Sequence, residues 1–261
     1  GELLEKWELP TRTENGGENI LPDIARSVQD CMARRGLSRD DCLGLGIGVP
    51  GPVDASGMVN RCVNLNWGVF NLHDALGILT GLRVRAGNDA NCAALGEFWM
   101  GGGSGCRSAI FVTLGTGIGG GVIVDGRLLT GAHGVGGELG HIEISAPDKA
   151  PCTCGKRGCV DAYCSAKVLS ALTGGNLALF FDGLRAGDRT LQAAWDEYLA
   201  HLAVAVNNLR MIFDCDVIVG GYVGGFLSEF GAPLRELLAR HNTFEPDSSY
   251  LKFSRYQLES S

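Results

Sequence analysis

The chain of 261 residues has no apolar stretch long enough to cross a membrane, no run of basic residues, no low-complexity linker and no short-period repeat. Lysine and arginine total 22 against 29 aspartate and glutamate residues, a net charge of −7. The first residues are too charged for a secretory signal peptide, and they lack an initiator methionine. We therefore expect no membrane and no nucleic acid among the partners, and a natural protein that begins upstream of Gly1.

Cysteine, in contrast, is plentiful: there are ten, and three of them follow a histidine closely, as His141, Cys152, Cys154 and Cys159. One histidine and three thiolates form a standard tetrahedral set for Zn²⁺, and four protein ligands leave no position for water or substrate. The pattern predicts a structural zinc site. A disulfide plus a spare thiol is the alternative, but the absence of a secretory segment and of other paired cysteine spacings favours a reducing compartment, the cytoplasm.

Apolar segments with the spacing of strands alternate with segments that have helical spacing, which predicts an α/β fold. Glycine is unusually frequent, at 40 residues, and clusters between these segments, as expected for binding loops lined by backbone. The predicted helices are Ile20–Arg34, Cys92–Trp99, Asp161–Leu172, Leu191–Phe213 and Pro233–His241. The predicted strands are Leu43–Val49, Leu82–Ala86, Ser108–Leu114 and Asp216–Val219, with a hairpin from Val122 to Leu129 that turns at Asp125-Gly126.

The glycine segment from Gly115 to Gly121 matches the dinucleotide-binding pattern G-x-G-x-x-G. That pattern requires a helix after the glycines, whereas a hairpin is predicted here. We interpret the segment as a phosphate cradle between two strands, with backbone N–H groups and the hydroxyl of Thr113 or Thr116 facing phosphate oxygens. Glycines that only turn a hairpin are the simpler alternative.

A group of short polar side chains, Asn88, Asp89 and Asn91, follows a predicted strand. One such residue before a helix is usually an N-cap. Three cannot all cap one helix, so the surplus indicates a site. A carboxylate at this place can accept the proton of a substrate hydroxyl during phosphoryl transfer.

Five motifs follow one another along the chain: Gly48-Val-Pro-Gly-Pro-Val-Asp54, Asn88-Asp-Ala-Asn91, Leu114-Gly-Thr-Gly-Ile-Gly-Gly-Gly121, Gly137-Glu-Leu-Gly-His141 and Cys152-x-Cys-Gly-x-x-Gly-Cys159. Together they resemble the ROK family of sugar kinases and related repressors. Within that family the chain is most similar to the bacterial glucokinases, and the resemblance runs from about Gly44 to Gly221. The cysteine motif is the most specific of the five.

The resemblance implies a two-domain α/β ATPase fold of the actin and hexokinase type, which is ribonuclease H-like, with a cleft between the domains. Residues 1–106 would form the small domain, without its first strands and phosphate loop. Residues 107–261 would form the large domain with the zinc knuckle. A homodimer or homotetramer is what the resemblance suggests.

The activity implied by the resemblance is phosphorylation of a hexose at its 6-hydroxyl by Mg-ATP, with glucose as the expected sugar and Asp89 as general base. His141 would serve zinc and sugar through opposite ring nitrogens. The implied sugar-binding residues are Gly51, Asn64, Asn88, Asp89, Glu138, His141 and Asp161. The implied ATP-binding residues are Thr113, Gly115, Thr116, Gly117, Gly220 and Gly221.

Three departures from the family pattern qualify this interpretation. The family's Asp-Gly-Gly-Thr loop, whose aspartate helps to hold magnesium, is absent, and we expect it upstream of Gly1. Asp161 stands where the family usually has glutamate, which leaves the sugar open among glucose, N-acetylmannosamine, N-acetylglucosamine and fructose. The chain also stops before the family's closing helix. A sugar-sensing transcriptional repressor of the same fold remains the rival hypothesis, although the intact Asn88-Asp89 and glycine loop favour a kinase.

Overall fold

The computed structural model describes residues 2–60, 62–132, 134–144 and 149–254. By their internal contacts they fall into two compact units: unit 1, with residues 2–60, 62–92, 132, 134 and 135, and unit 2, with residues 93–131, 136–144 and 149–254. A domain boundary between residues 106 and 107 remains a prediction, because compactness does not test independent folding. Residues 93–106 group with unit 2, where Ala94 and Phe98 pack against the same small core as Phe111 and Ile218.

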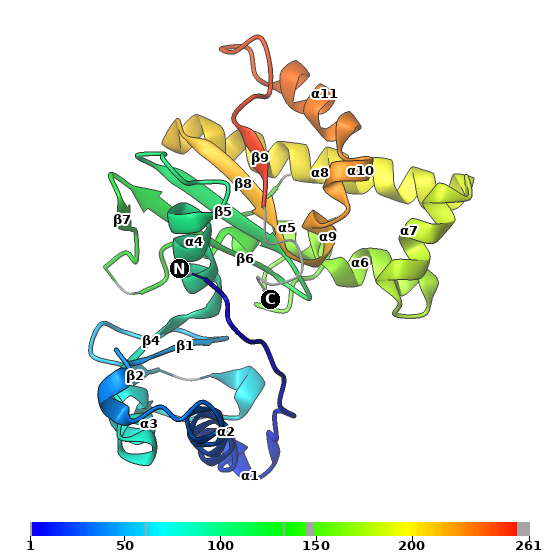
Figure 1. Ribbon diagram of the computed structural model, residues 1–261. Helices are drawn as coiled ribbons and strands as arrows, with labels where there is room; N and C mark the ends of the chain where they lie inside the picture. Colours follow the sequence, from blue (N-terminus) through cyan, green and yellow to red (C-terminus); the bar gives the residue numbers. More distant parts are fainter. Residues whose placement is uncertain (1, 61, 133, 145–148, 255–261) are drawn as a thin grey trace. The chain divides into compact units, whose positions relative to one another are not determined.

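Unit 1 is built on two parallel strands, β1 (Leu45–Val49) and β4 (Val84–Asn88), shown in light blue to cyan in Figure 1. Val49 pairs with Asn88, so the carboxyl ends of both strands lie level. The unit also contains α1 (Glu14–Gly17), α2 (Ile20–Arg34), η1 (Arg39–Asp41), β2 (Met58–Val59), η2 (Val63–Leu65), β3 (Phe70–Asn71) and α3 (Leu72–Thr80). Its core gathers apolar side chains of α2, α3 and the strands around Trp67, which is 6% exposed.

Helix α2 has the predicted bounds. Strand β1 begins two residues later than predicted, at Leu45, and ends as predicted, whereas β4 is shifted by two residues at both ends, to Val84–Asn88. Helix α4 (Asp89–Met100) begins three residues earlier than predicted, so Asp89 is its first residue. The reason is local: Asn88 Oδ1 accepts the Asn91 N–H at 3.0 Å and thereby caps the helix. Helix α3 was not predicted, although Asn71 caps it in the same way by accepting the Asp74 N–H.

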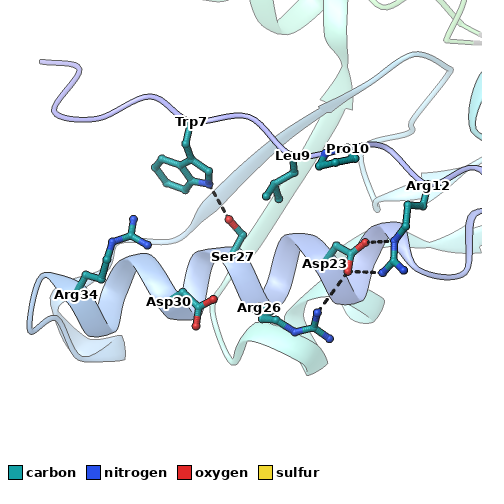
Figure 2. A pocket seen from close by; sticks show the side chains of 9 residues that line it. All are labelled: Trp7, Leu9, Pro10, Arg12, Asp23, Arg26, Ser27, Asp30 and Arg34. Carbon is teal, nitrogen blue, oxygen red and sulfur yellow. Dashed lines mark hydrogen bonds and ion pairs between the residues drawn. The ribbon is translucent and has the colours of Figure 1, made fainter.

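The chain before α2 lies along that helix and, with it, borders an open cavity of about 580 Å³ in unit 1 (Figure 2). Trp7 Nε1 donates to Ser27 Oγ at 2.6 Å, and Arg12 forms an ion pair with Asp23 at 2.6 Å. No residue predicted to be functional lines this cavity among the described residues. We therefore do not propose this cavity as a binding site for substrate or cofactor.

Unit 2 contains a five-stranded sheet in the order β7-β6-β5-β8-β9, in which β5, β8 and β9 run parallel and β6 pairs antiparallel with both β5 and β7. The strands are β5 (Ala109–Leu114), β6 (Ile118–Val124), β7 (Arg127–Leu128), β8 (Asp216–Gly220) and β9 (Leu251–Phe253). The helices are α5 (Val160–Cys164), α6 (Ala166–Ser170), α7 (Leu177–Arg185), α8 (Arg189–Phe213), α9 (Gly221–Gly224), α10 (Leu227–Phe230) and α11 (Ala232–His241), with short turns η3 (Leu139–His141) and η4 (Ala171–Thr173).

The glycine segment was predicted as a loop from Gly115 to Gly121, and the observed loop is shorter. Strand β6 already begins at Ile118, so only Gly115 to Gly117 form the loop. Gly120 lies within the strand, and a Cβ at this position would be only 2.5 Å from Leu139 Cδ1. Gly120 therefore allows η3 to pack closely on the strand. The hairpin itself is confirmed, with φ of 51° at Asp125 and 74° at Gly126, as a primed turn requires.

Helix α8, the long yellow helix in Figure 1, carries the core of unit 2. It begins two residues before its predicted start, since the Asp188 carboxylate accepts the N–H groups of Thr190 and Leu191. The predicted apolar stripe along it is buried throughout: Leu199, Leu202, Val206 and Leu209. Helix α8 contacts α5, α7 and α11, which places these shorter helices around it.

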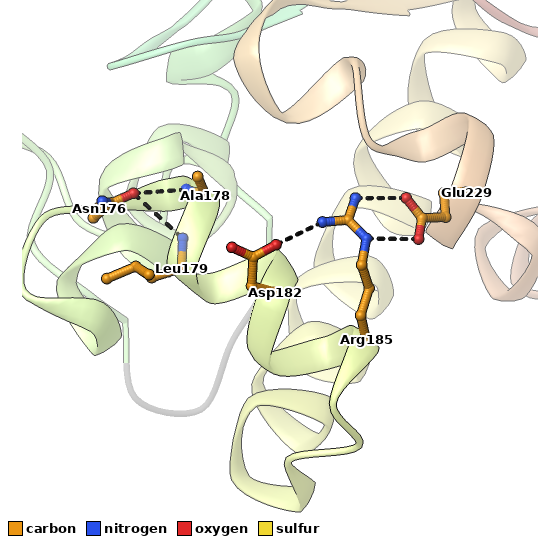
Figure 3. Close-up of polar contacts among 6 residues, drawn as sticks. All are labelled: Asn176, Ala178, Leu179, Asp182, Arg185 and Glu229. Carbon is orange, nitrogen blue, oxygen red and sulfur yellow. Dashed lines mark hydrogen bonds and ion pairs between the residues drawn. The ribbon is translucent and has the colours of Figure 1, made fainter.

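The helix predicted from Asp161 to Leu172 is wrong as a single element, because Ser165 is extended, with ψ of 155°, and separates α5 from α6. Helix α7 was not predicted. Figure 3 shows how it is held: Asn176 Oδ1 accepts the N–H groups of Ala178 and Leu179. At the other end, Arg185 forms a bidentate pair with Glu229 of α10.

Among the described residues no single helix is both long and apolar enough to cross a membrane. Only the segments Val160–Thr173 and Leu177–Arg185 taken together, which meet at an angle of 80°, have the necessary length and composition.

We expect Leu202→Ala to lower the free energy of unfolding by about 2–5 kcal/mol, because it deletes a fully buried side chain and leaves a cavity. Ile212→Ala changes the exposed side of the same helix, where Ile212 is 67% exposed, and should cost less than about 0.5 kcal/mol. Urea denaturation measures the free energy of unfolding of both variants. Equal losses would contradict the assignment of Leu202 to the core.

Candidate functional site

The four predicted metal ligands lie together in unit 2. The ligand atoms of His141, Cys152, Cys154 and Cys159 are all within 4.8 Å of one another. Cys154 Sγ is 3.7 Å from Cys159 Sγ, and Cys152 Sγ is 3.7 Å from His141 Nδ1. A tetrahedral Zn²⁺ with Zn–S bonds of about 2.3 Å separates its sulfur ligands by about 3.8 Å, so these side chains fit the ion.

The same distances exclude a disulfide between Cys154 and Cys159, whose sulfur atoms would be about 2.05 Å apart. All ten cysteines have free thiols in this structure. The alternative of a disulfide with a spare thiol is therefore not what the geometry supports.

Two glycines turn the chain around the metal cluster. Gly155 and Gly158 have φ of 89° and 81°, a region that residues with a Cβ rarely adopt. The first turn closes through a bond from Gly155 N–H to the Cys152 carbonyl at 3.0 Å, and the second bonds Gly158 N–H to the Ala150 carbonyl at 2.8 Å. Lys156 Nζ then donates to the His141 carbonyl at 2.8 Å and ties the turn to the histidine segment.

Burial and the neighbouring thiols raise the pKa of Cys159 to about 12, since its thiolate would lack hydration. The backbone N–H of Lys156 lowers the pKa of the exposed Cys154, because it bonds to the thiolate. Metal ligation requires thiolates, so binding must release protons and weaken as the pH falls.

The segment before the cluster carries Glu138, the N-cap residue of η3, and His141, the last residue of η3. Glu138 is exposed, and its carbonyl accepts the His141 N–H at 3.2 Å. Gly140 allows this segment to lie against β6, since a Cβ would be 2.3 Å from the Ile118 carbonyl oxygen. Because Nδ1 of His141 faces Cys152, the opposite nitrogen, Nε2, points away from that thiol.

The two predicted nucleotide segments lie at the same edge of the sheet, because they follow the adjacent parallel strands β5 and β8. The first turns sharply, with Gly115 N–H bonded to the Gly117 carbonyl at 3.1 Å. The second begins at Gly220 and Gly221. A Cβ on Gly221 would be 2.7 Å from Thr113 Oγ1, so only glycine permits this approach.

Thr116 and Gly117 are exposed at the tip of the first segment. Strand β6, and no helix, follows them, so the dinucleotide-binding pattern is not part of a Rossmann unit. Exposed backbone N–H groups between two strands can receive phosphate oxygens.

Asp161, on the first turn of α5, lies beside this glycine loop. Its Oδ1 accepts the Ile118 N–H at 2.6 Å. The family resemblance predicted a contact of Asp161 with a sugar hydroxyl and did not predict this bond. No local pattern could have revealed it, because the two residues are far apart in sequence and meet only through the fold.

In unit 1, Asn88 and Asp89 stand where β4 ends and α4 begins. Asp89 Oδ1 accepts the Ala90 N–H at 2.8 Å, and Gly48 lets β1 approach, since a Cβ there would be 3.2 Å from Asp89 Cα. Although solvent reaches the Asp89 side chain, the surrounding protein removes part of its hydration, and this desolvation raises the pKa of the carboxyl. The Ala90 bond acts in the opposite direction.

Gly51 lies beside Asn88, whose Nδ2 is 3.5 Å from the Gly51 carbonyl oxygen. Asn64 is exposed on η2, two residues after the buried Cys62, whose thiol donates to the Pro50 carbonyl. The structure thus gathers Gly51, Asn88 and Asp89 within unit 1. Glu138, His141, Asp161 and both glycine segments belong to unit 2.

Two residues that were not among the predicted catalytic and binding residues, Asn91 and Tyr222, lie close to them in the sequence. Asn91 Oδ1 is buried without a hydrogen-bond partner among the described residues. Tyr222 follows the second glycine segment, is 43% exposed, and has its ring edge 4.0 Å from where a Cβ on Gly115 would be. Tyr222 was not predicted as a site residue, although its position directly after Gly220-Gly221 is visible in the sequence.

The mixed α/β fold matches that of the ROK sugar kinases, which is of the actin and hexokinase type, and the Cys₃His cluster lies in unit 2 of this fold. The ROK family model matches residues 1–254, and the chain belongs to this family.

Relatives with known names agree with this assignment. The chain is 35% identical to a glucokinase of Halalkalibacterium halodurans, over 92% of this chain and 78% of the relative. It is 31% identical to a xylose repressor of Caldicellulosiruptor bescii, over 91% of this chain and 65% of the repressor. A crystal structure of a ROK family glucokinase from Streptomyces griseus, in complex with glucose and AMPPNP, superposes with a TM-score of 0.73 at 26% identity and covers 97% of this chain and 88% of that one.

We expect the purified protein to contain about one zinc ion per chain, because four ligands converge in a tetrahedral set. Cys154→Ala should lose most of this metal, since it removes an exposed ligand without opening the core. Cys31→Ala removes a cysteine of α2 outside the cluster and should keep it. Elemental analysis of the three proteins measures the metal. Equal metal in all three would contradict the ligand assignment.

Proposed function

We propose that the protein is an ATP-dependent hexose kinase that phosphorylates the 6-hydroxyl of its sugar, with glucose as the first candidate. The observation that carries this proposal is the carboxylate of Asp89 at the start of α4, within the frame of a ROK protein whose relatives include named glucokinases. Phosphoryl transfer needs a base on the acceptor hydroxyl and a polar cradle for the phosphates, and this chain has candidates for both.

Asp89 is the proposed general base. Its Oδ1 is held by the Ala90 N–H, which leaves Oδ2 to accept the proton of the sugar hydroxyl. Desolvation raises the pKa of the carboxyl and so makes its ionised form a stronger base than an ordinary aspartate. Asn88 supports the geometry by capping α4 and holding Asp89 at its start.

The proposed sugar contacts are polar groups suited to hydroxyls: Gly51, Asn64, Asn88, Glu138, His141 and Asp161. His141 would donate or accept through Nε2 while Nδ1 binds zinc, so that the metal fixes the orientation of the ring. Asp161 has Oδ1 committed to Ile118, which leaves Oδ2 for a hydroxyl.

Mg-ATP would bind along Thr113, Gly115, Thr116, Gly117, Gly220 and Gly221. Backbone N–H groups at the edge of the sheet, with the threonine hydroxyls, would hold the phosphates. Bound Mg-ATP supplies the phosphoryl group and neutralises the charge that develops on it. The chain itself positions the sugar hydroxyl and removes its proton.

The metal is proposed to be structural zinc, because the cluster offers four protein ligands and no open position. Ten cysteines with free thiols suit a reducing compartment, and we propose the cytoplasm. A homodimer or homotetramer is proposed from the family.

The rival function is that of a sugar-sensing repressor, which the 31% identity to a xylose repressor supports. Turnover separates the two, since a sensor binds sugar without phosphorylating it. Kinases of N-acetylmannosamine, N-acetylglucosamine or fructose are alternatives within the first proposal.

We expect the full-length protein to phosphorylate one sugar in a panel of hexoses and N-acetylhexosamines with Mg-ATP. Asp89→Asn should lower kcat by about 10²–10⁴-fold, because it removes the base, while sugar affinity stays close to that of the wild type. The control is Asp74→Asn, at an exposed aspartate of α3. Coupled assay of ADP release and calorimetric sugar binding measure the two effects. Sugar binding with no turnover by the wild type would favour the repressor.

The pH dependence of kcat/KM tests the environment of Asp89. The base works only when ionised, and its pKa is raised above the ordinary 3.8, so activity should rise with pH and fall on acidification at a pH above that value. In Asp89→Asn, the residual kcat/KM should no longer show this decrease on acidification. A midpoint at or below 3.8 in the wild type, over a range where the fold is intact by circular dichroism, would contradict the role of desolvation.

A further inference from the structure

The glycine loop from Gly115 to Gly117 is held from outside the sheet by a carboxylate. Asp161 Oδ1 accepts the N–H of Ile118, the residue that directly follows the loop, at 2.6 Å. A hydrogen bond to an ionised acceptor is stronger than one between neutral groups. This bond therefore fixes where the loop ends and β6 begins.

A second bond holds the start of the loop. The N–H of Ala166, the first residue of α6, donates to the Gly115 carbonyl at 2.8 Å. The loop also leaves room for the carboxylate, since a Cβ on Gly117 would be 3.1 Å from Asp161 Oδ1. Helices α5 and α6 thus secure both ends of a loop whose own residues make one internal bond, from Gly115 N–H to the Gly117 carbonyl.

Helix α5 is itself anchored on two sides. The metal ligand Cys159 is its N-cap residue, and the N–H of Val160 donates to the Ile142 carbonyl at 2.9 Å. At its other end, the Cys164 carbonyl accepts the buried Tyr198 hydroxyl at 2.6 Å. Asp161 is two residues from Cys159, so the metal cluster and the glycine loop share one short helix.

We propose that Asp161 is a positioning residue that holds the glycine loop in its phosphate-binding conformation and connects that loop to the metal cluster through α5. The proposal rests on the proposed function, since it assumes that the loop receives nucleotide phosphates. It differs from a contact with sugar, because Oδ1 acts on the backbone of the loop whether or not sugar is bound.

The first test is the bond itself, which does not depend on function. The Ile118 amide should exchange with deuterium slowly in the wild type and at least about tenfold faster in Asp161→Ala, because the variant removes its acceptor. Asp161→Asn keeps a neutral acceptor of nearly the same shape and should lie between the two. Equal exchange at Ile118 in all three proteins would overturn the proposal.

The second test is the affinity for Mg-ADP in the absence of sugar, measured by calorimetry on the zinc-loaded, full-length protein. Asp161→Ala should weaken binding by about tenfold, the loss expected when a charge-assisted bond no longer orders the loop. Asp161→Asn should recover part of it, a rescue that a general loss of stability would not produce.

The matched control is Asp188→Ala, which removes a carboxylate that accepts the N–H groups of Thr190 and Leu191 at the start of α8. It breaks the same kind of bond in the same unit and should leave Mg-ADP affinity within about twofold of the wild type. Equal losses in Asp188→Ala and Asp161→Ala would overturn the proposal in favour of a general structural effect.

The outcomes separate this proposal from the proposed function. If the wild type binds Mg-ADP and Asp161→Ala binds it equally well, the positioning role is wrong and the kinase assignment stands. If the wild type binds no Mg-ADP, both are overturned. If Asp161→Ala weakens only sugar binding, the residue contacts sugar alone and the positioning role is wrong.

Discussion

The constraint on which the other features of unit 2 depend is the packing of the Cys/His cluster and its flanking segments against β6. Gly140 and Gly120 have no side chains because η3 and the strand approach too closely for a Cβ at either position. That approach sets His141 at the end of η3, and Cys159 then begins α5. Asp161 can reach Ile118 only because α5 starts there. A metal held by four ligands would stabilise this whole arrangement at one point.

The proposed role of Asp89 in unit 1 depends on a simpler feature: the two parallel strands β1 and β4 end at paired residues. Val49 pairs with Asn88, so the turn at Gly51 and the start of α4 emerge at the same edge of the sheet. Asn88 serves as the cap of α4, so the carboxylate of Asp89 is not needed to cap the helix, and its Oδ1 accepts the neighbouring Ala90 N–H. Desolvation of that carboxylate raises its pKa, which suits a base more than a structural cap.

Much of the fold was predictable because its elements have strong local patterns. The apolar period of α2 and α8, the primed turn at Asp125-Gly126 and the four metal ligands all follow from short segments of sequence. The short elements α7 and β9 were missed, since each is too short to show a clear apolar period and is held by neighbours such as Glu229 and β8. The break at Ser165 was missed as well, because an extended residue within a helical pattern is a response to packing rather than to local preference.

The sequence by itself determined the family, the order of the motifs and the identities of the proposed base and metal ligands, since each rests on residue types at close spacing. Only the tertiary structure decided which groups meet across long separations. It joined Asp161 to Ile118, brought Gly221 against Thr113 and placed both glycine segments at one edge of the sheet. These contacts arise from strand pairing and helix packing, which depend on the whole core and leave no local pattern in the chain.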